Sequence, residues 1–172
     1  MIHLNIGSNL ASKYGSKFEN ISIALNLLIE SKIKINEISN FYETPSYPNK
    51  NFPNFVNIGL TIDFAGSHHD LLKKIKLIEK KLGRIKTKKN DPRIIDIDII
   101  DFNSTIKDNG TLILPHPKCH LRNFVLFPIL QIDPNWSHPI LKKNARFLIN
   151  KLSQKLRIEI TRLHKNVKIK HD

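Results

Sequence analysis

Two aspartates, Asp96 and Asp98, stand in a run of isoleucines, RIIDIDII, at residues 93–100. Side chains alternate along a strand, so the two carboxylates share one face and the isoleucines share the other. Their Cα atoms are then about 6.5–7 Å apart, close enough for the carboxylates to repel each other unless a cation is present. Mg²⁺ is usually held by one or two carboxylates with waters and substrate phosphates, so this pair is a candidate site for one metal ion or two. The alternative is two surface acids neutralised by Arg84 or Arg93.

A basic loop precedes the acids and carries Arg84, Lys86, Lys88, Lys89 and Arg93. A metal ion beside arginines is the usual equipment for phosphoryl transfer. Arginine offers phosphate oxygens a planar fork and stays charged at every relevant pH, so Arg84 and Arg93 are stronger candidates than the lysines. For Lys88 and Lys89, a flexible basic surface loop is the better interpretation.

The segment PHPKCHLRNF, residues 115–124, places His116, Cys119, His120 and Arg122 between prolines and an apolar stretch. A zinc site needs four ligands, and one cysteine with scattered histidines does not supply a convincing set. A second group of phosphate contacts, made by a histidine and an arginine, is the better hypothesis, with helix capping as the alternative.

A long connection, TPSYPNKNFPNFVN, covers residues 44–57 and carries Tyr47, Phe52 and Phe55. Loops of this length inside a compact domain tend to be lids or binding loops. Aromatic rings together with Asn57 could stack on a flat heterocycle and hydrogen-bond to it. The rings could equally pin the loop to the core, an alternative as good for Phe52 and weaker for Phe55.

The elements that must position these residues follow from periodicity and capping. Ser67 and Asp70 form a capping box ahead of an apolar stripe that stops at Gly83, which predicts a helix. The order strand, helix, strand, strand, helix, strand predicts an α+β fold with a ferredoxin-like βαββαβ core, an antiparallel sheet and helices on one face. The strands are expected at 2–6, 35–45, 55–64 and 93–100, and the helices at 17–31 and 67–83.

The C-terminal part adds further elements to this core. Residues 121–132 and 144–156 have helical patterns, the first interrupted at Pro128, and residues 157–163 could form a late edge strand. The tail after about residue 163 is expected to be frayed. No repeat or linker marks a second domain, so residues 1–172 are expected to form one.

Composition sets the outer bounds. A chain of 172 residues with 40% hydrophobic content suits one domain with a sizeable core. The N-terminus resembles neither a signal peptide nor a membrane span, and the single cysteine excludes an internal disulfide, so we expect a cytoplasmic protein. The net charge of +13 favours an anionic partner such as nucleic acid, an anionic membrane or a nucleotide triphosphate. General drift toward lysine explains this excess equally well.

Two other function classes compete with phosphoryl transfer. A nucleic-acid-binding module would interleave aromatic and basic residues on exposed strands, whereas the basic residues here fall mostly in loops and on the helix at 67–83. It would also leave two acids on one strand unexplained. A metal-dependent nuclease would share Asp96 and Asp98, yet it would need more clustered acids and a base that activates water.

The blocks IGSNL, FYETP, FPNFVN, LGR, DPRIIDIDII and LPHPKCHLRNFVLFPI occur in this order over about residues 1–135. Together they resemble the 6-hydroxymethyl-7,8-dihydropterin pyrophosphokinase family of folate biosynthesis. The resemblance implies a ferredoxin-like core, ATP as co-substrate and two Mg²⁺ ions. It also implies transfer of the β,γ-pyrophosphoryl group of ATP to the hydroxymethyl oxygen of the pterin, with release of AMP. Both partners are small molecules, so neither nucleic acid nor membrane is required, and we expect a monomer.

The resemblance also assigns roles to individual residues. It implies that Asp96 and Asp98 bind the metal and that Arg84 and Arg93 act with them in catalysis. The implied ATP contacts are Lys76, Glu79, Arg84, Lys86, Arg93, Ile99, His116 and Arg122. The implied pterin contacts are Thr44, Pro45, Phe55, Asn57, Asp96 and Phe124, of which Phe124 stacks directly on the ring. Tyr47, from the aromatic loop, is a further candidate pterin contact.

Departures from the family pattern gather in the ATP loops. Asn90 and Asp91 stand where family members commonly have Trp-Gly, so an aromatic lid is missing and a negative charge lies near the triphosphate. Lys86 replaces a frequent arginine, and Thr111 and Ile113 replace polar contacts. We expect weaker ATP binding with the chemistry retained. Either a carboxylate or a metal-bound water could accept the proton of the pterin hydroxyl.

Overall fold

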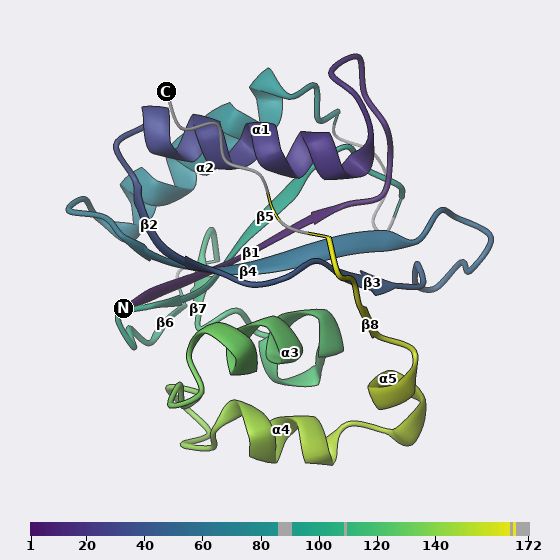
Figure 1. Ribbon diagram of the computed structural model, residues 1–172. Helices are drawn as coiled ribbons and strands as arrows, with labels where there is room; N and C mark the ends of the chain where they lie inside the picture. The colour runs from purple at the N-terminus through teal and green to yellow at the C-terminus, as the bar shows by residue number, and fades with distance from the viewer. Residues whose placement is uncertain (86–90, 109, 166, 168–172) are drawn as a thin grey trace.

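The structure, a computed structural model, describes residues 1–85, 91–108, 110–165 and 167. An antiparallel sheet runs through the molecule, with helices above and below it (Figure 1). In chain order the elements are β1 (Ile2–Ser8), α1 (Lys17–Glu30), β2 (Lys34–Ile38), β3 (Tyr42–Thr44), β4 (Phe55–Asp63), α2 (His68–Lys81), β5 (Asp96–Phe102), β6 (Lys107–Asp108), β7 (Ile113–Leu114), the 3₁₀ turn η1 (Cys119–Leu121), α3 (Asn123–Ile132), α4 (Ala145–Lys151), α5 (Gln154–Ile158) and β8 (Thr161–Arg162).

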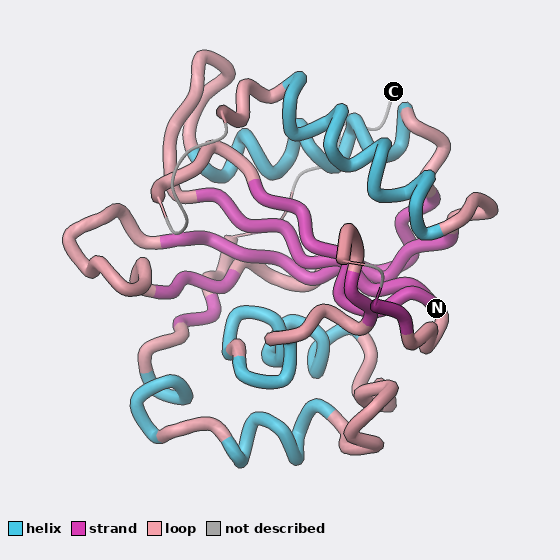
Figure 2. Tube along the Cα trace, turned by 180° about the vertical axis from the view of Figure 1, so that it is seen from behind, coloured by secondary structure: helices cyan, strands magenta, loops and turns pink. Residues whose placement is uncertain are grey.

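The main sheet has the strand order β5-β1-β4-β3-β8, and β2 pairs with the part of β4 that β3 leaves free. All of these pairings are antiparallel. Helices α1 and α2 cover one face, as expected for the core, while α3 and α4 cover the other, and the view from behind in Figure 2 shows the same layers. The predicted α+β fold with an antiparallel sheet is confirmed, and the C-terminal helices form an additional layer on the second face.

Strand β1 lies between β5 and β4, and the alternation of its side chains assigns one side to each layer. Ile2, Leu4 and Ile6 are buried in the core under α1 and α2. The polar residues between them are buried as well, because α3 covers the opposite face. Asn5, for example, donates through Nδ2 to the carbonyl oxygens of Ile58 and Phe124, at 3.1 and 2.9 Å. The polar Asn5 on this face therefore hydrogen-bonds to protein groups. If the face were open to solvent, its partner would be water.

Helix α2 begins and ends where its sequence predicts. Ser67 accepts from the Asp70 amide, and Asp70 in turn accepts from the Ser67 amide, which makes the expected capping box. Gly83 follows the helix with φ +89°, a left-handed conformation that glycine adopts at low cost.

Helix α3 continues through Pro128, so the predicted interruption at this residue is wrong. Proline cannot donate to the carbonyl four residues earlier, which belongs to Phe124. Asn5 fills that vacancy from β1, since its Nδ2 donates to the same oxygen. Gly59 on β4 lets the proline approach the sheet, because a Cβ at position 59 would lie 2.8 Å from Pro128 Cβ.

Three further elements differ from the prediction. The extended stretch at 35–45 forms two strands, β2 and β3, with an irregular connection between them in which Ser39 still bonds to Gly59 on β4. The predicted helix at 144–156 breaks into α4 and α5, since the Ser153 side chain caps a new helix by accepting from the Leu156 amide. The predicted late edge strand exists in shortened form as β8. Beyond it, Leu163 packs against the main core, and so does Val167, which lies where we expected a frayed tail.

Two groups of buried side chains stabilise the two layers. The larger lies between the sheet and helices α1 and α2, and the smaller, which includes Ile100 and Trp136, lies against α3 and α4. Among the helices of the described residues, none has the length and apolarity needed to span a bilayer.

Candidate active site

The sheet presents Asp96 and Asp98 on the face that α3 covers. Asp96 lies opposite Gly7 and Asp98 lies opposite Asn5 on β1, while Ile97 between them is buried in the core on the other side. The side chains of Asp96 and Asp98 keep 24% and 31% of their surface exposed. The shared face predicted from alternation is therefore present in the structure.

Arginines from three segments contact the two carboxylates. Arg84 and Arg93 each place a guanidinium nitrogen on Asp96, at 2.7 Å from Oδ1 and 2.8 Å from Oδ2. Arg122 approaches Asp98 Oδ2 at 3.5 Å. The structure thus brings together all four residues predicted to be catalytic, together with one predicted ATP contact.

Charge and burial shift the ionisation of these groups. Burial raises the pKa of Asp98 to about 6, the negative charge of Asp96 adds to the shift, and Arg122 opposes it. Burial also lowers the pKa of His116 to about 4, helped by the positive charge of Arg122, so His116 is neutral at pH 7. For Arg84, burial opposes the charged form, but Asp96 and Glu79 outweigh it and raise its pKa.

Glu79 links helix α2 to the edge of the sheet. Its side chain is only 3% exposed, and Oε1 accepts a hydrogen bond of 2.9 Å from the Ile97 amide on β5. It also forms ion pairs with Arg84 and, at 2.8 Å, with Lys76. A buried carboxylate needs such partners. Glu79 therefore orients Arg84, and its placement assigns it a positioning role at the edge of β5.

An open pocket of about 240 Å³ adjoins Asp98, between α2 and the β6–β7 hairpin. Three predicted ATP contacts line it, Lys76, Ile99 and His116. The other lining residues are the predicted metal ligand Asp98 and Leu72, Ile97, Gly110, Thr111, Leu112, Ile113 and Pro117. Lys86 and Asn90 lie outside the described residues. A larger open hollow of about 460 Å³, around Met1 and Lys32, contains none of the predicted site residues.

Most of the predicted pterin contacts lie on the same face of the sheet. Thr44 and Asn57 are buried, and Asn57 Nδ2 donates to Thr44 Oγ1 at 3.4 Å. The Phe55 ring lies under the guanidinium of Arg93, at 5.9 Å from its centroid. Pro45 follows Thr44 directly and is half-buried.

Two further aromatic residues predicted to contact the pterin, Phe124 and Tyr47, differ in their surroundings. Phe124, in the first turn of α3, lies under the guanidinium of Arg122 at 5.4 Å, beside the metal-binding candidates. Tyr47 is 83% exposed, so its role as a pterin contact stays a prediction. Its position in the loop between β3 and β4 leaves the ring in solvent.

Asn9 is a site residue that sequence reasoning missed. Its Oδ1 accepts from the Arg93 amide at 2.8 Å, and its own amide donates to the Arg93 carbonyl at 3.2 Å. Its Nδ2 donates to Ser46 Oγ and to the Pro53 carbonyl, at 3.2 and 3.1 Å. Asn9 therefore joins the loop between β3 and β4 to Arg93, a predicted ATP contact. An amide immediately after a strand, in IGSNL, was the available signal.

We expect Asn9→Ala to lower kcat by about tenfold, because the Arg93 amide then loses its side-chain acceptor and keeps only the main-chain bond from the Asn9 amide to the Arg93 carbonyl. Asn9→Asp, which keeps the acceptor but not the donor, should recover part of that loss. The measurement is the steady-state rate of AMP formation, with Asn26→Ala on α1 as a control. Equal kcat values for the wild type and Asn9→Ala would contradict this positioning role.

We expect Asp98→Asn to stabilise the metal-free domain at pH 7.5. The folded-state pKa of Asp98, about 6, lies above its ordinary value of 3.8, so ionised Asp98 destabilises the fold at high pH. This penalty is complete above about pH 6 and disappears as the pH falls through 6 toward 4. Allowing for the partial exposure of Asp98, the variant should gain about 1–2 kcal/mol at pH 7.5. Urea unfolding at pH 7.5 and pH 4.5, without Mg²⁺, measures this gain, and a gain of the same size at both pH values would contradict the prediction.

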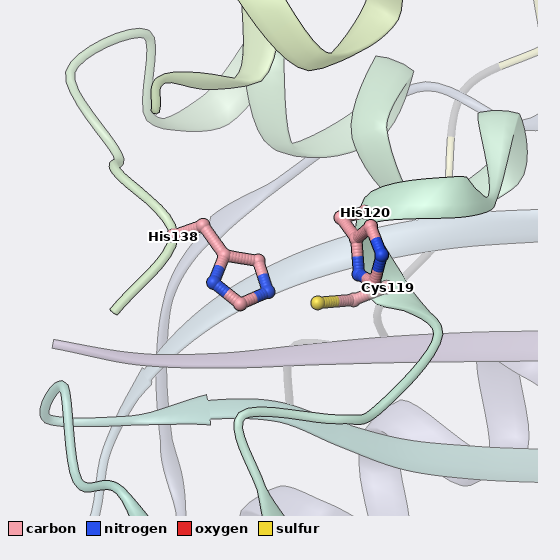
Figure 3. Close-up of side chains that lie close together, drawn as sticks. All are labelled: Cys119, His120 and His138. Atoms are coloured by element: carbon pink, nitrogen blue, oxygen red, sulfur yellow. The ribbon is translucent and has the colours of Figure 1, made fainter. Parts of the chain in front are cut away.

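Cys119, His120 and His138 lie together under α3 (Figure 3). One potential ligand atom from each lies within 4.8 Å of the others, and His138 is the partner that sequence spacing did not suggest. His138 Nδ1, however, accepts from the amides of Ile140 and Leu141, both at 3.2 Å, so the neutral ring carries its proton on Nε2. Figure 3 shows this Nε2 facing Cys119, where it has no lone pair to offer a metal. Burial also raises the pKa of the Cys119 thiol to about 12. The hydrogen bonds of His138 and the protonated thiol of Cys119 therefore favour a packing cluster over a metal site.

Comparison with known proteins gives a family match and several relatives. The family described as 7,8-dihydro-6-hydroxymethylpterin-pyrophosphokinase (HPPK) matches residues 3–134. The 2-amino-4-hydroxy-6-hydroxymethyldihydropteridine pyrophosphokinase of Aquifex aeolicus is 36% identical over 142 residues, which cover 83% of this chain and 86% of that protein.

Longer proteins match as well. The folic acid synthesis protein FOL1 of Dictyostelium discoideum is 40% identical over 141 residues, 82% of this chain, and the corresponding protein of Schizosaccharomyces pombe is 35% identical over 158 residues, 91% of this chain. The matched segment spans 21% of each of these two proteins. Among solved structures, Plasmodium falciparum HPPK-DHPS has a TM-score of 0.68 at 17% identity, covering 94% of this chain and 47% of that one, which shows a common fold.

Proposed function

This chain belongs to the 7,8-dihydro-6-hydroxymethylpterin-pyrophosphokinase family, and on that premise we propose that it transfers pyrophosphate from ATP to 6-hydroxymethyl-7,8-dihydropterin. The pterin hydroxyl oxygen would attack the β-phosphorus of ATP, and the bond from that phosphorus to the α,β-bridging oxygen would break. AMP leaves with the bridging oxygen, and the hydroxyl proton passes to a carboxylate or to water. The product is the pterin diphosphate, an intermediate of folate biosynthesis.

One observation carries this proposal. Asp96 and Asp98 share a face of the sheet with Asn57 and Phe124. Asp98 also lines the pocket that contains Ile99 and His116. A nucleotide on one side and a pterin on the other would therefore meet at the two carboxylates. Such an arrangement supplies the proximity and orientation on which transfer between two bound substrates depends.

The donor set suits Mg²⁺. Asp96 and Asp98 offer hard carboxylate oxygens, and the pKa of Asp98 is raised first by burial and then by the negative charge of Asp96, which a cation would offset. Both carboxylates would hold the metal, for which we propose two ions. When bound, Mg²⁺ supplies charge neutralisation on the phosphate oxygens.

The arginines would have different partners before and after a cation binds to the carboxylates. In the structure, Arg84 and Arg93 neutralise Asp96, and Arg122 approaches Asp98. Once a cation occupies the carboxylates, these guanidinium groups are available for the triphosphate, for which their planar forks suit them. His116, neutral at pH 7, would contact the nucleotide as a hydrogen-bonding group without charge.

The pterin would lie between aromatic residues and a buried amide. Phe124 and Phe55 each pack against an arginine, which leaves flat surfaces for a heterocycle beside the phosphate site. Asn57 would read the edge of the ring through its amide, with Thr44 holding its orientation.

All the proposed contacts come from one chain, so we propose a monomer acting as a single catalytic domain. ATP as co-substrate favours a cytoplasmic location. The family match and its named relatives support an enzyme of this class and do not support the nucleic-acid-binding or nuclease alternatives.

The test is whether AMP formation depends on the pterin. Purified protein is incubated with ATP and Mg²⁺, with and without 6-hydroxymethyl-7,8-dihydropterin, and nucleotides are separated by chromatography. We expect AMP only when the pterin is present. AMP formed at the same rate without pterin would reject the proposal.

A further inference from the structure

Residues 154–163 lie beyond the family match, which ends at residue 134, yet they contact the residues that precede two proposed pterin contacts, Thr44 on β3 and Phe124 on α3. This segment contains helix α5 and strand β8, and Figure 1 shows it passing from the α3 layer up to the edge of the sheet at β3. We call residues 154–163 the C-terminal strap.

At one end, the strap adds a strand to the sheet beside Thr44. Arg162 lies opposite Tyr42 and Thr161 lies opposite Glu43, and the Leu163 amide donates to the Phe41 carbonyl at 2.8 Å. Tyr42 in turn lies opposite Asn57 on β4. Strand β3 has only three residues, so without β8 it would be a short exposed edge.

The Arg162 side chain extends this contact to helix α3. Its Nε and one terminal nitrogen donate to Asn40 Oδ1, at 3.1 and 2.7 Å. Gln131 on α3 also donates to Asn40 Oδ1, at 2.5 Å, and its Oε1 accepts from the Tyr42 hydroxyl at 3.0 Å. This network joins β8, β3 and α3, and it is the kind of linked polar network that makes an arrangement rigid when each member has a partner.

At the other end, the strap contacts the first turn of α3. The buried Asn123 donates through Nδ2 to the Leu156 carbonyl at 2.7 Å. Its Oδ1 accepts from the amide of the next residue, Phe124, also at 2.7 Å. The ring of Phe124 is the one proposed to stack on the pterin. Its backbone amide is therefore held by Asn123, and the strap orients Asn123.

We propose that the C-terminal strap positions the pterin-binding groups of β3, β4 and α3, with Arg162 and the backbone of Thr161 as positioning residues. This inference rests on the proposed function, because it assigns the strap to one of its two substrates. The described part of the ATP pocket is lined by residues of α2, β5, the β6–β7 hairpin and the turn that follows it, none of them in the strap. Loosening the strap should therefore weaken pterin binding selectively.

The test compares Thr161→Pro with Thr161→Val in the full chain. Because the Leu163 amide bonds to Phe41, the alternation of an antiparallel ladder directs the Thr161 amide toward β3 as well. Proline removes that donor, whereas valine keeps it and retains a β-branched shape. Arg162→Ala is a second variant that removes an exposed side chain, so the test remains decisive if Thr161→Pro does not fold.

We expect Thr161→Pro to raise the KM for pterin about tenfold and Arg162→Ala about threefold, while the KM for ATP changes less than about twofold. Thr161→Val should match the wild type. If the KM values for both substrates rise together, or if neither changes in a folded variant, the strap has no selective role and the inference fails. A wild-type protein without pterin-dependent AMP formation would instead reject the proposed function, which separates the two failures.

Discussion

Replacing Asp98 with alanine is expected to lower kcat by about 10³-fold or more while the domain stays folded, because this carboxylate would hold the cation that neutralises the transferring group. Asp96→Ala should have a similar effect. Neither change should unfold the domain, since the two carboxylates repel each other and each removal leaves arginines that can reach the remaining acid. Steady-state kinetics at saturating Mg²⁺ and a thermal melt without Mg²⁺ measure the two effects.

A matched control separates this loss from a general effect of charge. Asp63 ends β4, is well exposed and has only a 3.6 Å ion pair with Lys34, so Asp63→Ala should leave kcat within about twofold. An Asp98→Ala variant that unfolds would indicate a structural role for the carboxylate. A folded variant with wild-type kcat would remove Asp98 from the mechanism altogether.

The arginines give the second large effect. We expect Arg84→Ala and Arg93→Ala each to lower kcat/KM for ATP by about 10²–10³-fold, because each removes a guanidinium that we propose contacts the phosphates. Arg84→Lys and Arg93→Lys should recover only a small part of this loss, since an ammonium keeps the charge but not the planar fork. Arg146 on α4 is exposed and distant from the acids, so Arg146→Ala is the control.

The two arginine variants should differ in stability, which gives an independent readout. Arg84 pairs with Glu79, a carboxylate only 3% exposed, and its removal leaves that buried charge with Lys76 and one backbone amide. We expect Arg84→Ala to lower the free energy of unfolding by about 1–3 kcal/mol. Arg93→Ala should cost less, because Asp96 keeps Arg84 as a partner. Equal losses of stability, or activity retained in either variant, would contradict this division of roles.

The sequence predicts those features of the fold that depend on interactions between residues close together in the chain. It does not predict features that depend on contacts between distant residues. Alternation in RIIDIDII predicts the shared face of Asp96 and Asp98, and the capping box at Ser67 predicts where α2 begins, because both signals are local. Pro128 was misjudged because the group that satisfies the Phe124 carbonyl, the Asn5 side chain, lies 119 residues away. Propensity alone cannot include such a partner.

The candidate site shows the same limit. The clustering of Arg84, Arg93 and Arg122 around the two aspartates agrees with the roles that the resemblance implied. Asn9 was missed because its four hydrogen bonds join segments that become neighbours only in the folded sheet. Tyr47 was included because its loop is aromatic, yet nothing in the loop sequence says which ring turns outward. The β8 pairing with β3 depends likewise on a long-range contact, which explains why only an edge strand could be predicted there.

The central claim is that the two aspartates organise transfer of an intact pyrophosphoryl group from ATP to the pterin. Phosphorus NMR of a complete reaction with Mg²⁺ tests it most directly, because it distinguishes every phosphorus-containing product. The account predicts AMP and the pterin diphosphate in equal amounts, with neither ADP nor free pyrophosphate as a primary product. ADP with a pterin monophosphate, or AMP with free pyrophosphate and unchanged pterin, would contradict it.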